Sequence, residues 1–207
     1  MCGVWMSVVS STPHSHPHIG MTKKILASFL SLFALAAGAS EPTLARDLAN
    51  PGPLKPITAL DVPRYMGTWY EIAKYPNWFQ KKCTGETRAE YTLRPDGHVQ
   101  VINRCRLESG EMTEAIGTAR QLGPSSSPKL EVRFAPSWLS FLPFVWGDYW
   151  VIDLDERYQL AAVSEPKQEY LWILSRSKTV DPTAYQQLLE RLARKGYDLQ
   201  KLELTRQ

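Results

Sequence analysis

Short β-prone segments that recur about every ten residues constrain the fold of this chain more than any other feature. From Gly67 onward eight such segments alternate with turn-forming residues, and no helical periodicity separates them. Evenly spaced short strands are typical of an all-β sandwich or barrel. We therefore predict an all-β fold with strands over residues 69–75, 87–93, 99–106, 112–120, 129–134, 149–154, 158–164 and 170–175.

The clearest hairpin joins the second and third of these segments. Apolar residues alternate on both sides of Asp96-Gly97, a pair that supplies the positive φ angles of a tight turn. A two-residue turn at this point would place Cys105 opposite Arg88. Hairpins of this kind predict an antiparallel arrangement in which consecutive strands are neighbours.

The pattern changes after the eighth segment. Asp181 is a favourable N-cap, Pro182 suits the first helical position, and Gly196 is a typical C-terminal stop. Between them one apolar stripe is formed by Tyr185, Leu188, Leu189 and Leu192. We predict one amphipathic helix over about 181–195 that packs on the sheet rather than lying on a membrane surface, followed by a short final strand over 199–204.

The N-terminal region has the composition of an export signal. Lys23 and Lys24 precede an apolar run over 25–35, and small residues follow at 36–40. This is the order of a secretory signal peptide, and the run is too short for a membrane-spanning helix. We predict a non-native upstream extension over 1–20, a signal peptide over 21–39, an extended segment over 40–60 and one domain over 61–207.

The predicted cleavage site carries Ala39 and Ser40, with no cysteine to bear a lipid anchor. We therefore expect an exported periplasmic protein, with peripheral association with the outer membrane as a further option. The chain has 24 basic against 21 acidic residues, and two of the basic residues lie in the predicted signal peptide. Such a balance does not form the concentrated basic face that nucleic acids require, so we predict no nucleic-acid partner.

Three short motifs, in order along the chain, resemble the lipocalin family. Gly67-Thr68-Trp69 enters the first strand as the family's Gly-x-Trp motif does. Gly147-Asp148-Tyr149 resembles the Thr-Asp-Tyr motif before the sixth strand, and Arg176 resembles the arginine after the eighth. The Tyr70-Glu71-Ile72-Ala73 run is similar to the bacterial outer-membrane lipoprotein type of lipocalin and to apolipoprotein D. The resemblance covers residues 61–205.

The resemblance implies an eight-stranded antiparallel up-and-down lipocalin barrel with one C-terminal α-helix and a short final strand. It also implies a structural role for Gly67, Trp69 and Arg176 at the closed end, with the guanidinium over the indole ring. Such stacking is worth about 0.5–2 kcal/mol once partly desolvated. The barrel would open at the rim formed by the connections after strands one, three, five and seven.

An eight-stranded barrel is just wide enough to hold one small ligand. If Trp69 faces the interior, alternation places on the same face Glu71, Ala73, Tyr75, Ala89, Tyr91, Leu93, Val99, Val101 and Asn103. We predict that the chain carries or stores a lipid, namely a fatty acid, lysophospholipid or phospholipid, in envelope lipid maintenance. The predicted ligand-binding residues are Glu71, Tyr75, Trp78, Phe79, Tyr91, Asn103, Trp138, Phe141, Phe144 and Tyr149.

Glu71 is the unexpected residue of this wall, because a carboxylate that faces an apolar interior is costly unless it is protonated or paired. One interpretation is that Glu71, with Tyr91 and Asn103, holds the polar head of the ligand. The alternatives are an internal salt bridge and an error in the assigned face. The sequence leaves these open.

The connection over 136–146 is the most apolar stretch of the domain, although it lies where a polar loop is expected. Exposed apolar patches mark contacts with ligands, membranes or proteins. The loop either meets a membrane or partner and helps acyl chains to enter, or it folds down as a lid on the barrel. An interaction module that docks through this loop is the alternative function.

Cys83 and Cys105 are the two cysteines of the predicted mature chain, and Cys2 lies upstream. An even pair in an exported protein predicts a disulfide, worth roughly 3 kcal/mol for a loop of about 20 residues. It would join the rim to the third strand. Two free buried thiols are the alternative.

His98 is the only histidine of the predicted mature chain, so neither a catalytic triad nor a catalytic zinc site is readily assembled. We predict no enzyme activity, no catalytic residue, no metal and no cofactor. A lipid-modifying enzyme that uses Glu71 and Tyr91 is the remaining alternative. The oligomeric state is open.

Overall fold

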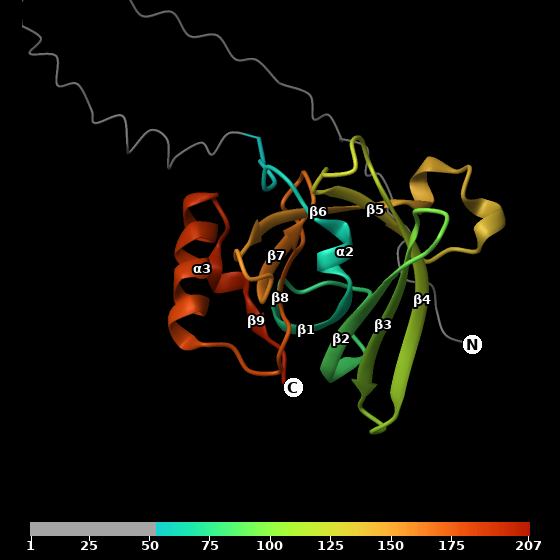
Figure 1. Cartoon of the computed structure of the whole chain (residues 1–207). Coiled ribbons are helices and arrows are strands. Elements are labelled where there is room, and N and C mark those ends of the chain that lie inside the picture. The colour runs from blue at the N-terminus through green and yellow to red at the C-terminus, as the bar shows by residue number, and fades with distance from the viewer. Residues whose placement is uncertain (1–52) are drawn as a thin grey trace, which may run out of the picture.

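A closed barrel of eight antiparallel strands forms the body of the molecule, and one long helix lies against its outside (Figure 1). The computed structural model describes residues 53–207. The predicted upstream extension, the signal peptide and most of the segment over 40–60 therefore lie outside the described residues. Each strand pairs with the next, and β1 closes the barrel by pairing with both β8 and β2. This confirms the predicted fold class.

Each of the eight predicted segments overlaps a strand of the barrel. The strands are β1 (Gly67–Lys74), β2 (Cys83–Leu93), β3 (Val99–Leu107), β4 (Met112–Gln121), β5 (Lys129–Arg133), β6 (Gly147–Leu154), β7 (Leu160–Ser164) and β8 (Leu171–Ser175). A ninth strand, β9 (Glu203–Leu204), pairs with β1 outside the barrel. The other elements are α2 (Val62–Tyr65), α3 (Pro182–Arg194) and the 3-10 turns η1 (Ser137–Leu139), η2 (Pro143–Val145) and η3 (Leu199–Lys201).

The helix after the barrel forms as predicted. The Asp181 side chain accepts a hydrogen bond from the backbone N–H of Ala184, which caps α3. Leu188 and Leu192 of the apolar stripe are fully buried in a cluster with Ile173 of β8 and other residues on the outer face of the barrel. No helix among residues 53–207 is long and apolar enough to cross a membrane.

The β2–β3 hairpin differs from the predicted one by a single residue. Leu93 pairs with Val99, and in this register Arg88 faces Arg104, so the predicted pairing of Arg88 with Cys105 is wrong. The connection is longer than a two-residue turn and places Gly97 at φ +81°. A three-residue loop with glycine in the left-handed region is the next most common hairpin connection.

A β-bulge in β1 determines which residues face the interior. Glu71 and Ala73 pair with successive residues of β8, which leaves Ile72 as the extra residue. Because a bulge interrupts the two-residue alternation, the residues after it change face. Ala73 and Tyr75 consequently lie in the outer cluster beneath α3, where the Tyr75 hydroxyl donates to the carbonyl oxygen of Asp198 at 3.0 Å. Their predicted interior facing is wrong for this reason.

Candidate functional site

The barrel contains a mostly apolar cavity with a volume of about 110 Å³. Aliphatic side chains from β2 to β5 form much of its wall, among them Ala89, Val101 and Val132. Five of the predicted ligand-binding residues line it, namely Glu71, Phe79, Tyr91, Asn103 and Tyr149. Tyr75, Trp78, Trp138, Phe141 and Phe144 do not, and neither does Leu93, which is partly exposed at the end of β2.

The closed end of the barrel is built around Trp69, which is fully buried. The guanidinium of Arg176 lies 4.0 Å from the centre of the Trp69 ring. Its three nitrogens donate to the carbonyl oxygens of Tyr158, Thr68 and Arg64 at 3.0–3.3 Å. Gly67, at φ +95°, leaves room for Arg176, because a Cβ there would lie 3.2 Å from Nη1. The structure thus brings Gly67, Trp69 and Arg176 together.

Three tyrosines that line the cavity bring their hydroxyls together. Tyr65 comes from α2, Tyr91 from β2 and Tyr149 from β6. The Tyr149 hydroxyl lies 3.0 Å from that of Tyr65 and 3.1 Å from that of Tyr91. Burial raises the pKa of Tyr91 to about 12 and raises the pKa values of Tyr65 and Tyr149 as well. All three hydroxyls are therefore neutral hydrogen-bonding groups.

Sequence reasoning did not identify Tyr65. It precedes the first strand, where the alternation that assigns residues to the two faces of a strand does not apply. The short helix α2, capped by Asp61, places Tyr65 at the closed end. The centre of the Tyr65 ring lies 4.8 Å from the centre of the Trp69 ring.

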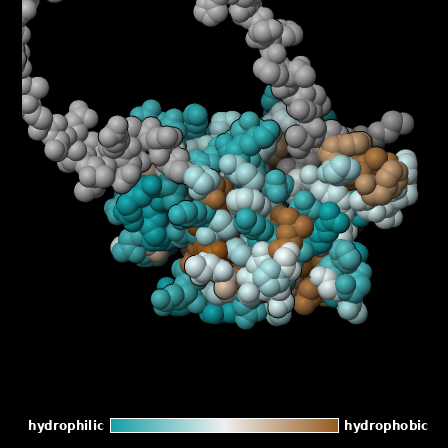
Figure 2. Space-filling model, turned by 90° about the horizontal axis from the view of Figure 1, so that it is seen from above, coloured by the Kyte–Doolittle hydropathy of each residue, from teal (hydrophilic) through white to brown (hydrophobic). Residues whose placement is uncertain are grey.

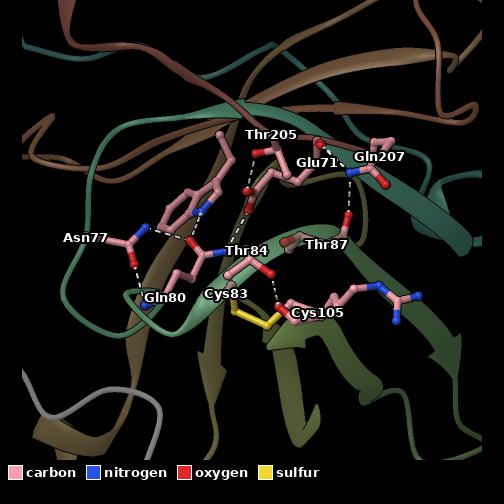
Figure 3. Close-up of a disulfide and its surroundings, with 11 residues drawn as sticks. Glu71, Asn77, Gln80, Cys83, Thr84, Thr87, Cys105, Thr205 and Gln207 are labelled. Atoms are coloured by element: carbon pink, nitrogen blue, oxygen red, sulfur yellow. Dashed lines mark hydrogen bonds between the residues drawn. A yellow bond between two sulfur atoms is a disulfide. The ribbon is translucent and has the colours of Figure 1, made fainter. Parts of the chain in front are cut away.

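Glu71 does face the cavity, and it is only 3 % exposed. One carboxylate oxygen accepts from Gln80 Nε2 at 2.6 Å and the other from Thr205 Oγ1 at 2.6 Å (Figure 3). Burial raises the pKa of Glu71, and these two donors oppose the rise. No ion pair of Glu71 occurs within residues 53–207. The alternative of an internal salt bridge is therefore excluded. Because Glu71 lines the cavity, the alternative that it was assigned to the wrong face of the strand is excluded as well.

The chain after β9 completes the wall beside Glu71. Strands β1 and β2 pair only over Gly67–Tyr70 of β1, and beyond that point the terminal residues lie between them. The N–H of Thr205 donates to Ile72 O, and the N–H of Glu86 donates to Arg206 O. Gln207 Nε2 donates to the carbonyl oxygens of both strands, at Glu71 and Thr87 (Figure 3).

Sequence reasoning missed these terminal partners. Thr205 and Gln207 follow a two-residue strand and carry no motif. The one local signal is Gly85 at φ +154°, where a Cβ would lie 2.6 Å from Arg206 O. A glycine in a strand often marks a close backbone approach, but it does not identify the approaching segment.

A disulfide joins Cys83, at the start of β2, to Cys105 in β3 (Figure 3). The Cα atoms are 5.6 Å apart, which is within the ordinary range for a disulfide. The predicted disulfide is confirmed, and the alternative of two free thiols is excluded. The bond holds the end of the β1–β2 connection next to β3.

The β1–β2 connection also holds Gln80, the residue that donates to Glu71, in position. Gln80 Oε1 accepts from Asn77 Nδ2 and from the indole N–H of Trp172 in β8. The ring of Phe79 packs near Trp172, while Trp78 is about half exposed. Gln80 is therefore held from two sides with its amide nitrogen directed at the carboxylate.

The apolar connection over 136–146 projects from the side of the barrel next to β4 and β5 (Figure 1), and apolar side chains gather on it (Figure 2). Trp138, Phe141 and Phe144 are 71 %, 75 % and 60 % exposed. At its end the Trp146 ring stacks on Arg120, whose Cζ lies 4.1 Å from the ring centre. None of these residues lines the cavity, which speaks against the alternative of a lid.

Residues 53–207 contain no group of three His, Cys, Asp or Glu side chains arranged to hold a metal ion. The titratable residues that line the cavity are three tyrosines, one glutamate and two arginines, namely Tyr65, Tyr91, Tyr149, Glu71, Arg88 and Arg104. Both arginines form ion pairs with Glu90.

Comparison with known proteins agrees with this geometry. The family model described as "Lipocalin-like domain" matches residues 60–207. Temperature-induced lipocalin-1 of Arabidopsis thaliana is 44 % identical over 73 % of this chain and 81 % of its own. Outer membrane lipoprotein Blc of Citrobacter freundii is 39 % identical over 77 % and 88 %. Apolipoprotein D of Mus musculus is 32 % identical over 71 % and 77 %. The resemblance seen in the sequence motifs is confirmed.

Proposed function

The chain belongs to the lipocalin family, and from this premise we propose that it binds a lipid in the barrel cavity and carries or stores it. The observation that carries the proposal is the mostly apolar cavity inside the barrel, whose polar groups are confined to a few points. A site of this kind removes apolar ligand surface from water while a few hydrogen bonds orient the ligand. The proposed ligands are a fatty acid, a lysophospholipid or a phospholipid.

We further propose that the protein is exported to the periplasm and serves in maintenance of envelope lipids. The signal-peptide pattern over 21–39 supports export. The name of one relative, an outer membrane lipoprotein, supports a place in the cell envelope. Cleavage of the leader is tested by the intact mass of the protein recovered from a periplasmic extract.

The cavity chemistry favours binding over catalysis. Both carboxylate oxygens of Glu71 already accept hydrogen bonds from Gln80 and Thr205. The tyrosines have raised pKa values and so do not act as bases near neutral pH.

Native mass spectrometry of the purified mature protein, with extraction and identification of bound lipid, tests this proposal. We expect a complex at one lipid per barrel, which delipidation removes and added lysophospholipid restores. A matched variant, Ala89→Trp, fills the cavity and should abolish the complex while the disulfide-bonded fold persists by circular dichroism. A barrel that remains empty after purification and after addition of each of the three lipid classes would refute it.

A second candidate, peripheral contact with a membrane or a partner protein, rests on the exposed aromatic residues of the 136–146 loop. Their rings suit the boundary between water and bilayer. This contact is compatible with lipid carriage, because a carrier must receive its cargo at a membrane.

A further inference from the structure

The three tyrosine hydroxyls at the closed end cannot satisfy one another completely. Tyr65, Tyr91 and Tyr149 together bring three O–H protons, and they form two hydrogen bonds, both through the Tyr149 oxygen. Within residues 53–207 the structure gives these hydroxyls no other partner. Whichever way the two bonds are directed, one O–H proton is left over.

The left-over proton belongs to a residue that lines the cavity. All three tyrosines line the cavity, and each is almost fully buried or packed against its wall, so bulk water does not surround the hydroxyls. A buried donor without an acceptor costs free energy, and a ligand that supplies the acceptor removes that cost.

We propose that the ligand bears an uncharged oxygen acceptor at the end that reaches the closed end, and that this oxygen accepts a hydrogen bond from the Tyr65–Tyr149–Tyr91 cluster. The inference rests on the proposed lipid-binding function and selects, among lipids, those with a carbonyl, ester or hydroxyl oxygen at the end that enters first. A fatty acid or phospholipid that entered with its terminal methyl group would leave the donor unused.

A charged head is disfavoured at this position because, among residues 53–207, the tyrosine cluster offers it one unused donor and the cavity wall offers no unpaired cation. Arg176 interacts electrostatically with the three tyrosines, but it stacks on Trp69 and donates to three backbone carbonyls, and it does not line the cavity. Arg88 and Arg104 do line the cavity, but both are paired with Glu90. A buried carboxylate needs several donors or a counter-ion to offset its lost hydration.

Three probes of equal carbon number separate these cases: undecane, methyl nonyl ketone and undecanoate. Their binding to the whole mature protein is measured by partitioning from vapour for the first two and by equilibrium dialysis for the anion. The test variant carries Tyr65→Phe, Tyr91→Phe and Tyr149→Phe together. Any single or double variant would still leave a hydroxyl with an unused proton. Tyr185→Phe, on α3 outside the barrel, is the matched control.

We expect the affinity for methyl nonyl ketone to fall about two- to tenfold in the triple variant, the range of one hydrogen bond to a neutral group. The affinity for undecane should stay the same or rise, and Tyr185→Phe should change neither. Undecanoate should bind wild type more weakly than the ketone. Equal losses for ketone and alkane, or tighter binding of the anion, would overturn the inference.

The vibrational spectrum of the bound ketone supplies a test that needs no variant. Its C=O stretch in the wild-type complex should lie below its frequency in alkane solvent, as hydrogen bonding requires. A stretch at the alkane value would refute the inference and leave lipid binding intact. If none of the three probes binds wild type although a lipid does, the inference is overturned and lipid binding stands. If the three lipid classes fail to bind as well, the proposed function fails too.

Discussion

At the scale of single residues, Glu71 and Arg176 show two ways to accommodate an ionisable group inside a small barrel. Glu71 has only neutral donors around it, so its raised pKa reflects burial that Gln80 and Thr205 offset in part. Arg176 stays outside the cavity and combines an aromatic face with three backbone acceptors. The first arrangement is sensitive to pH, and the second depends on the planar shape of the guanidinium.

The raised pKa of Glu71 predicts a specific pH dependence of stability. A carboxyl whose pKa is higher in the folded than in the unfolded state favours folding below its ordinary pKa, and this contribution is lost as pH rises through the raised value. The free energy of unfolding of wild type, relative to Glu71→Gln, should therefore fall as pH rises from about 4.5 toward neutral. Urea unfolding at a series of pH values measures it.

The control for this prediction is Glu190→Gln on the exposed side of α3, which measures how removal of a surface carboxylate alone affects the profile. Parallel profiles for wild type and Glu71→Gln would instead show that the Glu71 carboxyl has the same pKa in both states.

Arg176→Gln should destabilise the fold by about 2–4 kcal/mol, because it removes the stack on Trp69 and leaves two partly buried carbonyl oxygens without donors. The stability of Arg176→Lys should lie between those of wild type and Arg176→Gln, since a lysine keeps the positive charge but not the planar set of N–H donors. Arg157→Gln, at an exposed site, is the control. Chemical denaturation checks all three, and a loss at Arg176 no larger than at Arg157 would contradict the structural role of the closed end.

At the scale of elements, the strands and the helix were predictable and their irregularities were not. Period-two alternation and the Asp181 and Pro182 signals depend on neighbouring residues, so they can be read locally. The bulge at Ile72 and the terminal segment between β1 and β2 depend on residues far away in the sequence. The error at Tyr75 arose there, because alternation was continued through a bulge that has no local signature.

Gly85→Ala should loosen the terminal residues 205–207 from their place between β1 and β2. The new Cβ would lie 2.6 Å from Arg206 O, whereas at Gly110 no atom lies within 4 Å of an added Cβ. Both glycines have positive φ angles, so Gly110→Ala shares the backbone strain but not the clash. We expect faster amide hydrogen exchange at Thr205 and Glu86 in Gly85→Ala alone. Equal exchange in both variants would mean that the terminal residues stay bound between β1 and β2 despite the added Cβ, and it would contradict the prediction.

At the scale of the whole molecule, the barrel separates two apolar surfaces that differ in exposure. The inner surface is enclosed by the strands, and the Cys83–Cys105 disulfide and the terminal segment close its wall. The outer one is the 136–146 loop, over which apolar side chains gather on the surface (Figure 2). Its aromatic residues are not part of the cavity lining. A membrane contact by the loop would therefore dock the protein rather than cap the cavity.

Replacement of Trp138, Phe141 and Phe144 by Ser should reduce co-flotation with phosphatidylethanolamine–phosphatidylglycerol liposomes by severalfold, because burial of these rings supplies apolar transfer energy. Lipid binding in the cavity should not change, since the cavity lining excludes the loop. The matched control replaces exposed Ile116, Met112 and Leu204 by Ser. Unchanged co-flotation would eliminate the loop as a membrane contact.

The sequence by itself determined the all-β fold, its helix, its disulfide and the presence of Glu71 and Tyr91 at an inner wall, while the resemblance to the lipocalin family supplied the closed barrel. The first four follow from alternation, capping residues and cysteine parity, which act over short distances or by simple count. Only the tertiary structure decided that Thr205 and Gln80 satisfy Glu71, that Tyr65 completes a hydroxyl cluster, and that the aromatic loop stands apart from the cavity. Each depends on segments brought together by closure of the barrel, and no local pattern specifies which segments will meet.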